Sequence, residues 1–445
     1  MSEPAGSAGR ERFGTRLGFV LAAAGSAVGL GNMWRFPYQA AEGGGAAFVV
    51  LYVCLTFLIG VPVMAGEFAL GRRTGSSPAR ALRAVGGSWW TPLGLLFVMT
   101  PLLILAYFSV VSGWTLRYAL DALCGVSAPS AERFAEVSTG AAAIRYHLIV
   151  MGVTVGIVMG GIRKGIERAG LILMPTLFAL LLALAIWAMT LDGSGPGYAF
   201  YLRPSISALL DPVVFQQAAS QACLSLSIGM GVMITYGSYA PRRTDIGQQA
   251  VTVSLSDFSV AFIGGMVVFP VIFALGLSDQ VGASTMGALF ISLPGAFAEM
   301  GVAGRYVGVA FFVALLVAGV TSLISLLEVV TASLIDELGM RRRSATLAAG
   351  ALAAAVGVLP ALSQDALAVL DQLAGELLVI LGALGICVLV GWRMKRPVEE
   401  LRAGASAFFA RVAPGPVLLL RWVVPPVLLV ILWLSVRRFV ALVGG

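Results

Sequence analysis

The sequence predicts an all-helical protein that crosses a membrane many times. Three observations support this fold class: 59% of the 445 residues are hydrophobic, only 11% are charged, and the mean hydropathy is +0.94. Soluble globular chains carry about 25% charged and 45–50% apolar residues, so the composition argues against a soluble or disordered chain. It also gives no reason to expect nucleic-acid binding.

Eleven segments meet the requirement of about 20 mostly apolar residues for a membrane-spanning helix. We expect them to be joined by polar connections that carry most of the charge. The predicted spans are 15–36, 46–71, 92–122, 144–161, 166–190, 214–239, 250–275, 306–335, 344–362, 366–392 and 415–438.

The placement of basic residues predicts the orientation of these spans. If the N-terminus is cytoplasmic, the segments on that side carry 20 of the 29 lysines and arginines, as the positive-inside rule requires. An odd number of spans puts the C-terminus outside, with which Arg437 and Arg438 mildly disagree. A signal peptide is the alternative for the N-terminus, because arginines precede its apolar run. That run, however, continues through a glycine-rich stretch and ten further spans follow.

Cysteine and histidine chemistry has little support. Cys54, Cys124, Cys223 and Cys387 lie far apart, so they form neither a disulfide framework nor a CxxC metal site. An integral membrane enzyme would need a nucleophile–base pair or a metal cluster. His147 is the only histidine and has no evident partner in the sequence, so we do not expect an enzyme.

Two spans carry a Gly-x-Gly break beside small hydroxyl residues. Val28-Gly-Leu-Gly31 in the first span recurs as Ile228-Gly-Met-Gly231 in the sixth, 200 residues and five spans later. Because five is odd, the second copy enters the membrane from the opposite side, which is typical of an inverted repeat. Close helix packing is the alternative for one such motif. Two matched breaks favour freed backbone groups that line a binding site.

These motifs and several others resemble those of the neurotransmitter:sodium symporter family, many of whose bacterial members have eleven helices. The matching motifs are Arg16-Leu-Gly, Gly25-Ser-Ala-Val-Gly-Leu-Gly-Asn-Met-Trp-Arg-Phe-Pro37, Gly60-Val-Pro62, Glu67-Phe-Ala-Leu-Gly71, Trp114-Thr115, Lys164-Gly-Ile-Glu-Arg168, Met174-Pro175, Ser225-Leu-Ser-Ile-Gly229, Tyr236-Gly-Ser-Tyr239 and Ala318-Gly-Val-Thr-Ser322.

The resemblance implies a five-plus-five inverted-repeat, leucine-transporter-like fold with discontinuous helices 1 and 6 and one additional C-terminal helix. Residues 1–14 would form a cytoplasmic segment, 15–190 the first repeat, 191–392 the second, and 393–445 a cytoplasmic linker and helix 11. The implied activity is sodium-driven uptake of an amino acid or amine by alternating access. Gly165 and Pro175 would let the cytoplasmic end of helix 5 unwind.

The resemblance also implies two sodium sites built from hard oxygen donors, the ligand type that suits an alkali cation. The first would use the Ala27 carbonyl with the side chains of Asn32, Ser225 and Asp257. The second would use the carbonyls of Gly25, Val28 and Ala318 and the hydroxyls of Thr321 and Ser322. Backbonding within the helix is the alternative for these two hydroxyls taken alone.

Asp257 lies early in an otherwise apolar span, and an intramembrane carboxylate is a functional hypothesis by default. Chloride-dependent family members have a serine four residues further on, where this chain has Ala261. A fixed carboxylate would supply the charge that chloride supplies elsewhere, so we expect chloride-independent transport. A one-residue shift in the alignment would bring Ser256 and Val260 to these positions instead.

Two ion pairs would close the transport path. Arg35 and Asp371 match the family's outer pair, and Arg10 and Asp336 match the inner pair, with Ser238 and Tyr239 nearby. Exposed pairs contribute only about 0–1 kcal/mol each, which suits contacts that form and break. For Glu67 we favour a role in a helix-packing network.

The family's substrate positions correspond to Ser26, Ala27, Ile104, Phe108, Leu224, Ser225, Ser227, Met230, Ser322 and Leu326. Position 108 is usually a tyrosine that helps hold the substrate carboxylate, and position 224 is usually aromatic. No acid is placed to hold a lone ammonium, which argues against monoamines. The walls favour a small, neutral, apolar amino acid, with another zwitterionic solute as the alternative.

A substrate sensor that binds without transporting is a further alternative. The Ala- and Arg-rich chain resembles bacterial members, so we expect a multi-pass protein of the bacterial cytoplasmic membrane. The expected partners are a small-molecule substrate, sodium and the lipid bilayer, with no nucleic acid and no obligate protein partner.

Overall fold

The computed structural model describes residues 11–125, 131–274, 276 and 288–444, and every regular element within them is helical. The first half contains α1 (Arg16–Ala27), η1 (Gly31–Arg35), α2 (Phe36–Glu42), α3 (Ala46–Leu55), η2 (Thr56–Gly60), α4 (Val61–Thr74), α5 (Pro78–Gly86), η3 (Ser88–Trp90), α6 (Thr91–Cys124), α7 (Ala131–Ser138), α8 (Gly140–Met159), η4 (Ile162–Glu167) and α9 (Arg168–Ala188).

The second half begins with the short helices α10 (Gly195–Leu202) and α11 (Ile206–Leu209). It continues with α12 (Pro212–Ser225), α13 (Val232–Tyr239), α14 (Ile246–Ala274), η6 (Ala288–Ser292), α16 (Leu293–Glu299), α17 (Gly301–Leu338), α18 (Arg342–Leu362), α19 (Gln364–Leu370), η7 (Asp371–Leu378), α20 (Val379–Val388), η8 (Leu389–Arg393), α21 (Pro397–Arg402), α22 (Ala407–Val412), α23 (Pro414–Leu418), η9 (Leu419–Val423) and α24 (Val424–Gly444).

Each of the eleven predicted spans, numbered helices 1 to 11 in chain order, is covered by one or more of these elements, and short helices such as α5, α7, α10 and α11 lie between the spans. Within the described ranges, nine continuous helices are long and apolar enough to cross a membrane, and the bent pair 16–27 and 31–42 makes a tenth. The predicted sixth span is divided between α12 and α13, each too short to cross alone. Helices 1 and 6 are therefore the two interrupted spans, as predicted.

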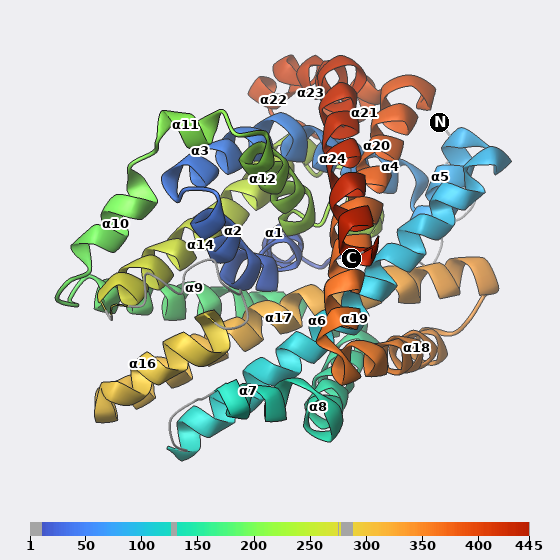
Figure 1. Cartoon of the computed structure of the whole chain (residues 1–445). Helices are drawn as coiled ribbons and strands as arrows, with labels where there is room; N and C mark the ends of the chain where they lie inside the picture. Colours follow the sequence, from blue (N-terminus) through green and yellow to red (C-terminus); the bar gives the residue numbers. More distant parts are fainter. Residues whose placement is uncertain (1–10, 126–130, 275, 277–287, 445) are drawn as a thin grey trace.

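The breaks in helices 1 and 6 lie inside the bundle. Figure 1 shows α1 and α2 among α9, α12, α14 and α17, and α1 contacts α9, α14 and α17. At the first break, Val28 is extended, with φ −75° and ψ 99°. Irregular backbone at this depth is tolerated only where protein surrounds it or a cavity receives it.

The helix 6 break depends on glycine at a close backbone approach. Gly229 has φ +74°, a left-handed conformation that glycine adopts at no steric cost. A Cβ atom there would collide with the Val379 carbonyl of α20. Ser227 is also left-handed, at φ +53°. The chain therefore fits helix 6 against helix 10 only through an unwound segment at residues 226–231.

Helix 5 holds the beginning of helix 1. The Glu167 carboxylate accepts hydrogen bonds from the backbone N–H groups of Gly14 (2.7 Å) and Thr15 (3.0 Å) and from the Thr15 hydroxyl (2.6 Å). Because Thr15 is the N-cap of α1, these bonds fix the helix start. Around Gly165, helix 5 is wound as the wide segment η4 and remains helical.

Candidate functional site

The two broken backbones meet each other at the centre of the bundle. The Ser227 hydroxyl donates a hydrogen bond of 2.9 Å to the Ser26 carbonyl. The Ser26 hydroxyl in turn donates one of 2.7 Å to Ser325 on α17. Both breaks and helix 8 thus contribute polar groups to one buried position.

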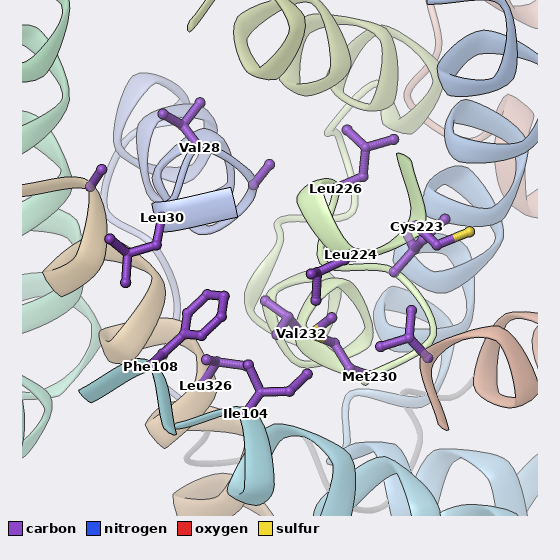
Figure 2. Close-up of a cluster of buried hydrophobic side chains, with 14 of the residues drawn as sticks. Val28, Leu30, Ile104, Phe108, Cys223, Leu224, Leu226, Met230, Val232 and Leu326 are labelled. Atoms are coloured by element: carbon purple, nitrogen blue, oxygen red, sulfur yellow. The ribbon is translucent and has the colours of Figure 1, made fainter. Parts of the chain in front are cut away.

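A small cavity of about 20 Å³ lies at this meeting point. All ten residues predicted as substrate positions line it, together with Gly29 and Gly31. In Figure 2, Ile104, Phe108 and Leu326 face Leu224 and Met230 across the gap between helix 3, helix 8 and the broken helix 6. The cavity has room for about one water molecule, so it must widen before it can hold an amino acid.

Apolar side chains form most of the cavity wall. Phe108 is 5% exposed and packs edge-on against Trp34, with ring centroids 6.3 Å apart. The neighbouring Tyr107 is not among the described residues that line the cavity, and its hydroxyl donates to the Asp371 carboxylate at 2.8 Å. The hydroxyl that the family usually has at position 108 is therefore not replaced by Tyr107.

Two of the residues predicted for the first sodium site, Asn32 and Ser225, both contact Asp257. Its Oδ1 atom accepts hydrogen bonds of 2.7 Å from both the Asn32 side-chain amide and the Ser225 hydroxyl. Tyr52 on α3, which the sequence analysis missed, donates to Oδ2. Ser256 instead bonds to the Thr252 carbonyl at 2.9 Å. The geometry therefore favours the alignment that brings Asp257, rather than Ser256, to this position.

The residues predicted for the second sodium site lie between helices 1 and 8. The Thr321 hydroxyl donates to the Ala318 carbonyl at 2.9 Å and approaches the Val28 carbonyl at 3.3 Å. Glycines of helix 1 let it pack closely against helix 8 here. A Cβ atom added at Gly25 would lie 3.5 Å from the Thr321 Cβ, and a Cβ atom added at Gly29 would collide with the Ser322 hydroxyl. The Thr321 hydroxyl therefore lies close to carbonyls of both helices, and the second sodium site itself stays a prediction.

The predicted outer pair forms, but it has an additional member. The Arg35 Nε atom lies 3.8 Å from Asp371 Oδ2. The shorter contact of Arg35 is with Glu376, where Nη2 and Oε1 are 2.5 Å apart. Glu376 was missed, although an acid within an apolar span is the same signal that singled out Asp257.

Only Asp336 of the predicted inner pair can be placed, because Arg10 lies outside the described residues. Asp336 accepts a hydrogen bond of 2.5 Å from the Ser77 backbone N–H. Nearby, the Tyr239 hydroxyl donates to Glu328 at 2.6 Å, and Arg342 pairs with the same carboxylate at 2.6 Å. The Arg10–Asp336 pair stays a prediction, and Glu328 and Arg342 are inner charged residues that the sequence analysis missed.

Two other singled-out residues take part in helix packing. Glu67, fully buried, accepts a hydrogen bond of 2.6 Å from the Gly229 backbone N–H, so it stabilises the unwound part of helix 6. His147 is not without a partner: it lies 2.9 Å from the Ser109 hydroxyl and 3.1 Å from the Ala354 carbonyl. The two contacts of His147 therefore join helices 3, 4 and 9.

The fold and the buried oxygen-rich centre define a secondary transporter with two interrupted helices. A family model for the sodium:neurotransmitter symporters matches residues 10–129 and 134–442, and the chain belongs to this family. Its members are transporters, not enzymes, so the protein is a sodium-dependent membrane transporter.

Individual relatives agree with this membership. A sodium-dependent transporter of Methanocaldococcus jannaschii is 36% identical, over 77% of this chain and 73% of its own. The sodium-dependent transporter YhdH of Bacillus subtilis is 32% identical, over 89% and 91%. The crystal structure of MhsT in complex with L-phenylalanine superposes with a TM-score of 0.86 at 36% identity, covering 96% of this chain and all of MhsT.

Proposed function

We propose that this protein imports a small, neutral, apolar amino acid together with sodium, by alternating access and without chloride. The observation that carries the proposal is the central cavity: all ten predicted substrate residues line it, at the meeting point of both interrupted helices. Unwound helix ends offer N–H groups and carbonyls that suit the carboxylate of an amino acid and a cation.

Two sodium ions are the proposed coupling ions. Asp257, Asn32 and Ser225 are in hydrogen-bond contact around one proposed site. Thr321 lies against the Val28 and Ala318 carbonyls at the other. Oxygen donors of this kind suit a hard cation, since it must exchange its hydration shell for protein ligands. Because Asp257 provides a fixed negative charge beside the first site, we propose that chloride is not required.

The apolar wall supports the substrate class. Ile104, Met230 and Leu326 bring no charge to the cavity, so the substrate side chain should be apolar. The similar transporter MhsT is in complex with L-phenylalanine in its crystal structure, which supports an amino acid here. Another zwitterionic solute is the alternative substrate, and a sensor that binds without transport is the alternative function.

The proposed location is the cytoplasmic membrane of a bacterium, with the N-terminus inside and the C-terminus outside. We also propose that the two repeats run from 15 to 190 and from 191 to 392, and that 393–445 adds the linker and helix 11. Accessibility of single cysteines placed at Arg163 and Asp365 to a membrane-impermeant reagent would test this orientation. We expect only the cysteine at 365 to react from outside intact cells.

A counterflow screen tests the substrate class. The purified protein is reconstituted into liposomes preloaded with each unlabelled amino acid in turn, and exchange with a labelled apolar amino acid is measured in sodium and in choline. We expect exchange only in sodium and mainly with apolar amino acids. Sodium-dependent binding without exchange would favour the sensor, and exchange with charged or amine substrates would contradict the proposed substrate class.

A further inference from the structure

Glu376 on η7 lies between two arginines from different parts of the chain. Its Oε1 atom is 2.5 Å from Nη2 of Arg35 on η1 and 4.0 Å from Nη1 of Arg438 on α24. The Glu376 side chain is only 5% exposed, whereas that of Arg438 is 44% exposed. One buried carboxylate oxygen is therefore within reach of a cation on helix 1 and a cation on helix 11.

We propose that Glu376 and Arg438 are positioning residues that together set the opening equilibrium of the outer gate. Glu376 holds Arg35 in the closed state, and Arg438 neutralises Glu376 when Arg35 moves away. The inference rests on the proposed function, in which helix 1 and helix 10 separate on the outer side of the substrate cavity.

Glu376 needs Arg35 as a counter-ion more than Asp371 needs it. Asp371 is 23% exposed and accepts a hydrogen bond from the Tyr107 hydroxyl, so water and Tyr107 remain with it after Arg35 leaves. For Glu376, Oε2 has no hydrogen-bond partner among the described residues. A buried carboxylate without a counter-ion is strongly disfavoured. The open state therefore needs another cation near Glu376, and Arg438 is in place to provide it.

Helix 11 is positioned to keep Arg438 beside Glu376 during opening. The helix α24 packs against both η7 and α20, so Arg438 and Glu376 sit on elements in direct contact. Arg35 lies on η1, next to the break in helix 1, where movement is easiest. When helix 1 moves relative to helix 10, the Arg35–Glu376 distance changes while the Arg438–Glu376 distance stays short.

The two residues thus have opposite effects on the gate. Glu376→Gln removes the main contact of Arg35 and favours the open state. Arg438→Gln removes the cation that stabilises Glu376 in the open state, and so favours the closed state. Because Arg438 acts through Glu376, the double variant should behave like Glu376→Gln alone. A residue needed only for packing would not produce opposite shifts of one equilibrium.

The test measures the distance distribution between two spin labels on the outer side of the gate. The labels are attached to Glu42→Cys at the end of α2, beyond the break in helix 1, and Asp365→Cys at the start of α19. Both positions are exposed, and the exposed Cys54 and Cys124 are changed to serine. Double electron–electron resonance is recorded in lipid nanodiscs with sodium. Arg437→Gln is the matched control. Arg437 is the neighbour of Arg438 in the chain, but its guanidinium lies over the Trp433 ring, 4.9 Å from the ring centroid.

We expect Glu376→Gln to raise the ratio of open to closed populations by about fivefold or more, and Arg438→Gln to lower it by a similar factor. Glu376→Asp should lie between Glu376→Gln and the parent. Shifts in the same direction, or a double variant that resembles Arg438→Gln, would overturn the proposal. Counterflow by the protein without gate substitutions tests transport separately. If that protein does not transport, the proposed function is refuted, while the spin-label distances still test the proposal about the outer gate.

Discussion

The side-chain amide of Asn32, in the interrupted part of helix 1, donates a hydrogen bond of 2.7 Å to the Asp257 carboxylate of helix 7. The same nitrogen lies 3.0 Å from the Asp257 carbonyl, and Asn32 Oδ1 accepts from the Gly29 N–H at 2.9 Å. Asn32 therefore joins the break in helix 1 to a buried acid. This connection makes Asp257 the residue on which ion selectivity should depend most.

We expect wild-type uptake to be equal in chloride and in gluconate at the same sodium concentration, because the proposed function assigns to Asp257 the negative charge that chloride would supply. Asp257→Asn should raise the sodium concentration for half-maximal uptake about tenfold or more, the factor expected for losing a charged hydrogen-bonding group. Adding Ala261→Ser to that variant should make uptake chloride-stimulated. Ser256→Ala is the control, since the Ser256 hydroxyl bonds to the Thr252 carbonyl of its own helix. Wild-type uptake that collapses in gluconate would contradict the prediction.

Thr321→Val should weaken sodium coupling while preserving the shape of the side chain. The substitution removes the hydroxyl that faces the Val28 and Ala318 carbonyls, so we expect about a tenfold higher sodium requirement in uptake titrations. Ser333→Ala on the same helix is the control, because its hydroxyl bonds to the Val329 carbonyl. Equal sodium titrations for Thr321→Val and Ser333→Ala would argue against a second ion site here.

Phe108→Tyr should restore a hydroxyl to the wall of the substrate cavity. Because Phe108 and Ser26 both line the cavity, a tyrosine at position 108 would give the substrate carboxylate another donor there. We expect severalfold tighter binding of apolar amino acids, about 1 kcal/mol for one hydrogen bond, measured by competition with a labelled amino acid. Phe97→Tyr, a buried phenylalanine on the same helix outside the cavity lining, is the comparison. Unchanged affinity and substrate range would show that position 108 is unimportant.

Gly229→Ala should destabilise the protein. The residue has φ +74°, and its added Cβ would collide with the Val379 carbonyl, so we expect a loss above about 1 kcal/mol and a lower thermal midpoint in detergent. Gly156→Ala on α8 has no neighbour within 4 Å and should be neutral or slightly stabilising. If both variants unfold at the wild-type temperature, the helix 6 break does not require glycine.

Local patterns were sufficient to predict the spans and both helix breaks, because each depends on residue type and spacing along one segment. The residues that line the cavity were named from the resemblance to the family, since they come from separate helices. Tyr52, Ser325 and Arg438 were missed, since their importance comes from distant helices that meet at Asp257, Ser26 and Glu376. Glu376 was within reach, because it is an acid in an apolar span. The sequence could not reveal that Glu376 lies closer to Arg35 than Asp371 does, because the two distances depend on how helices 1 and 10 pack.

Sodium-coupled import is best tested by the accumulation of an apolar amino acid in proteoliposomes driven only by an inward sodium gradient. We expect transient accumulation above the external concentration, abolished when potassium or choline replaces sodium or when an ionophore dissipates the gradient. Replacing chloride by gluconate should not reduce it. Accumulation that persists without a sodium gradient, or binding without accumulation, would contradict sodium-coupled import.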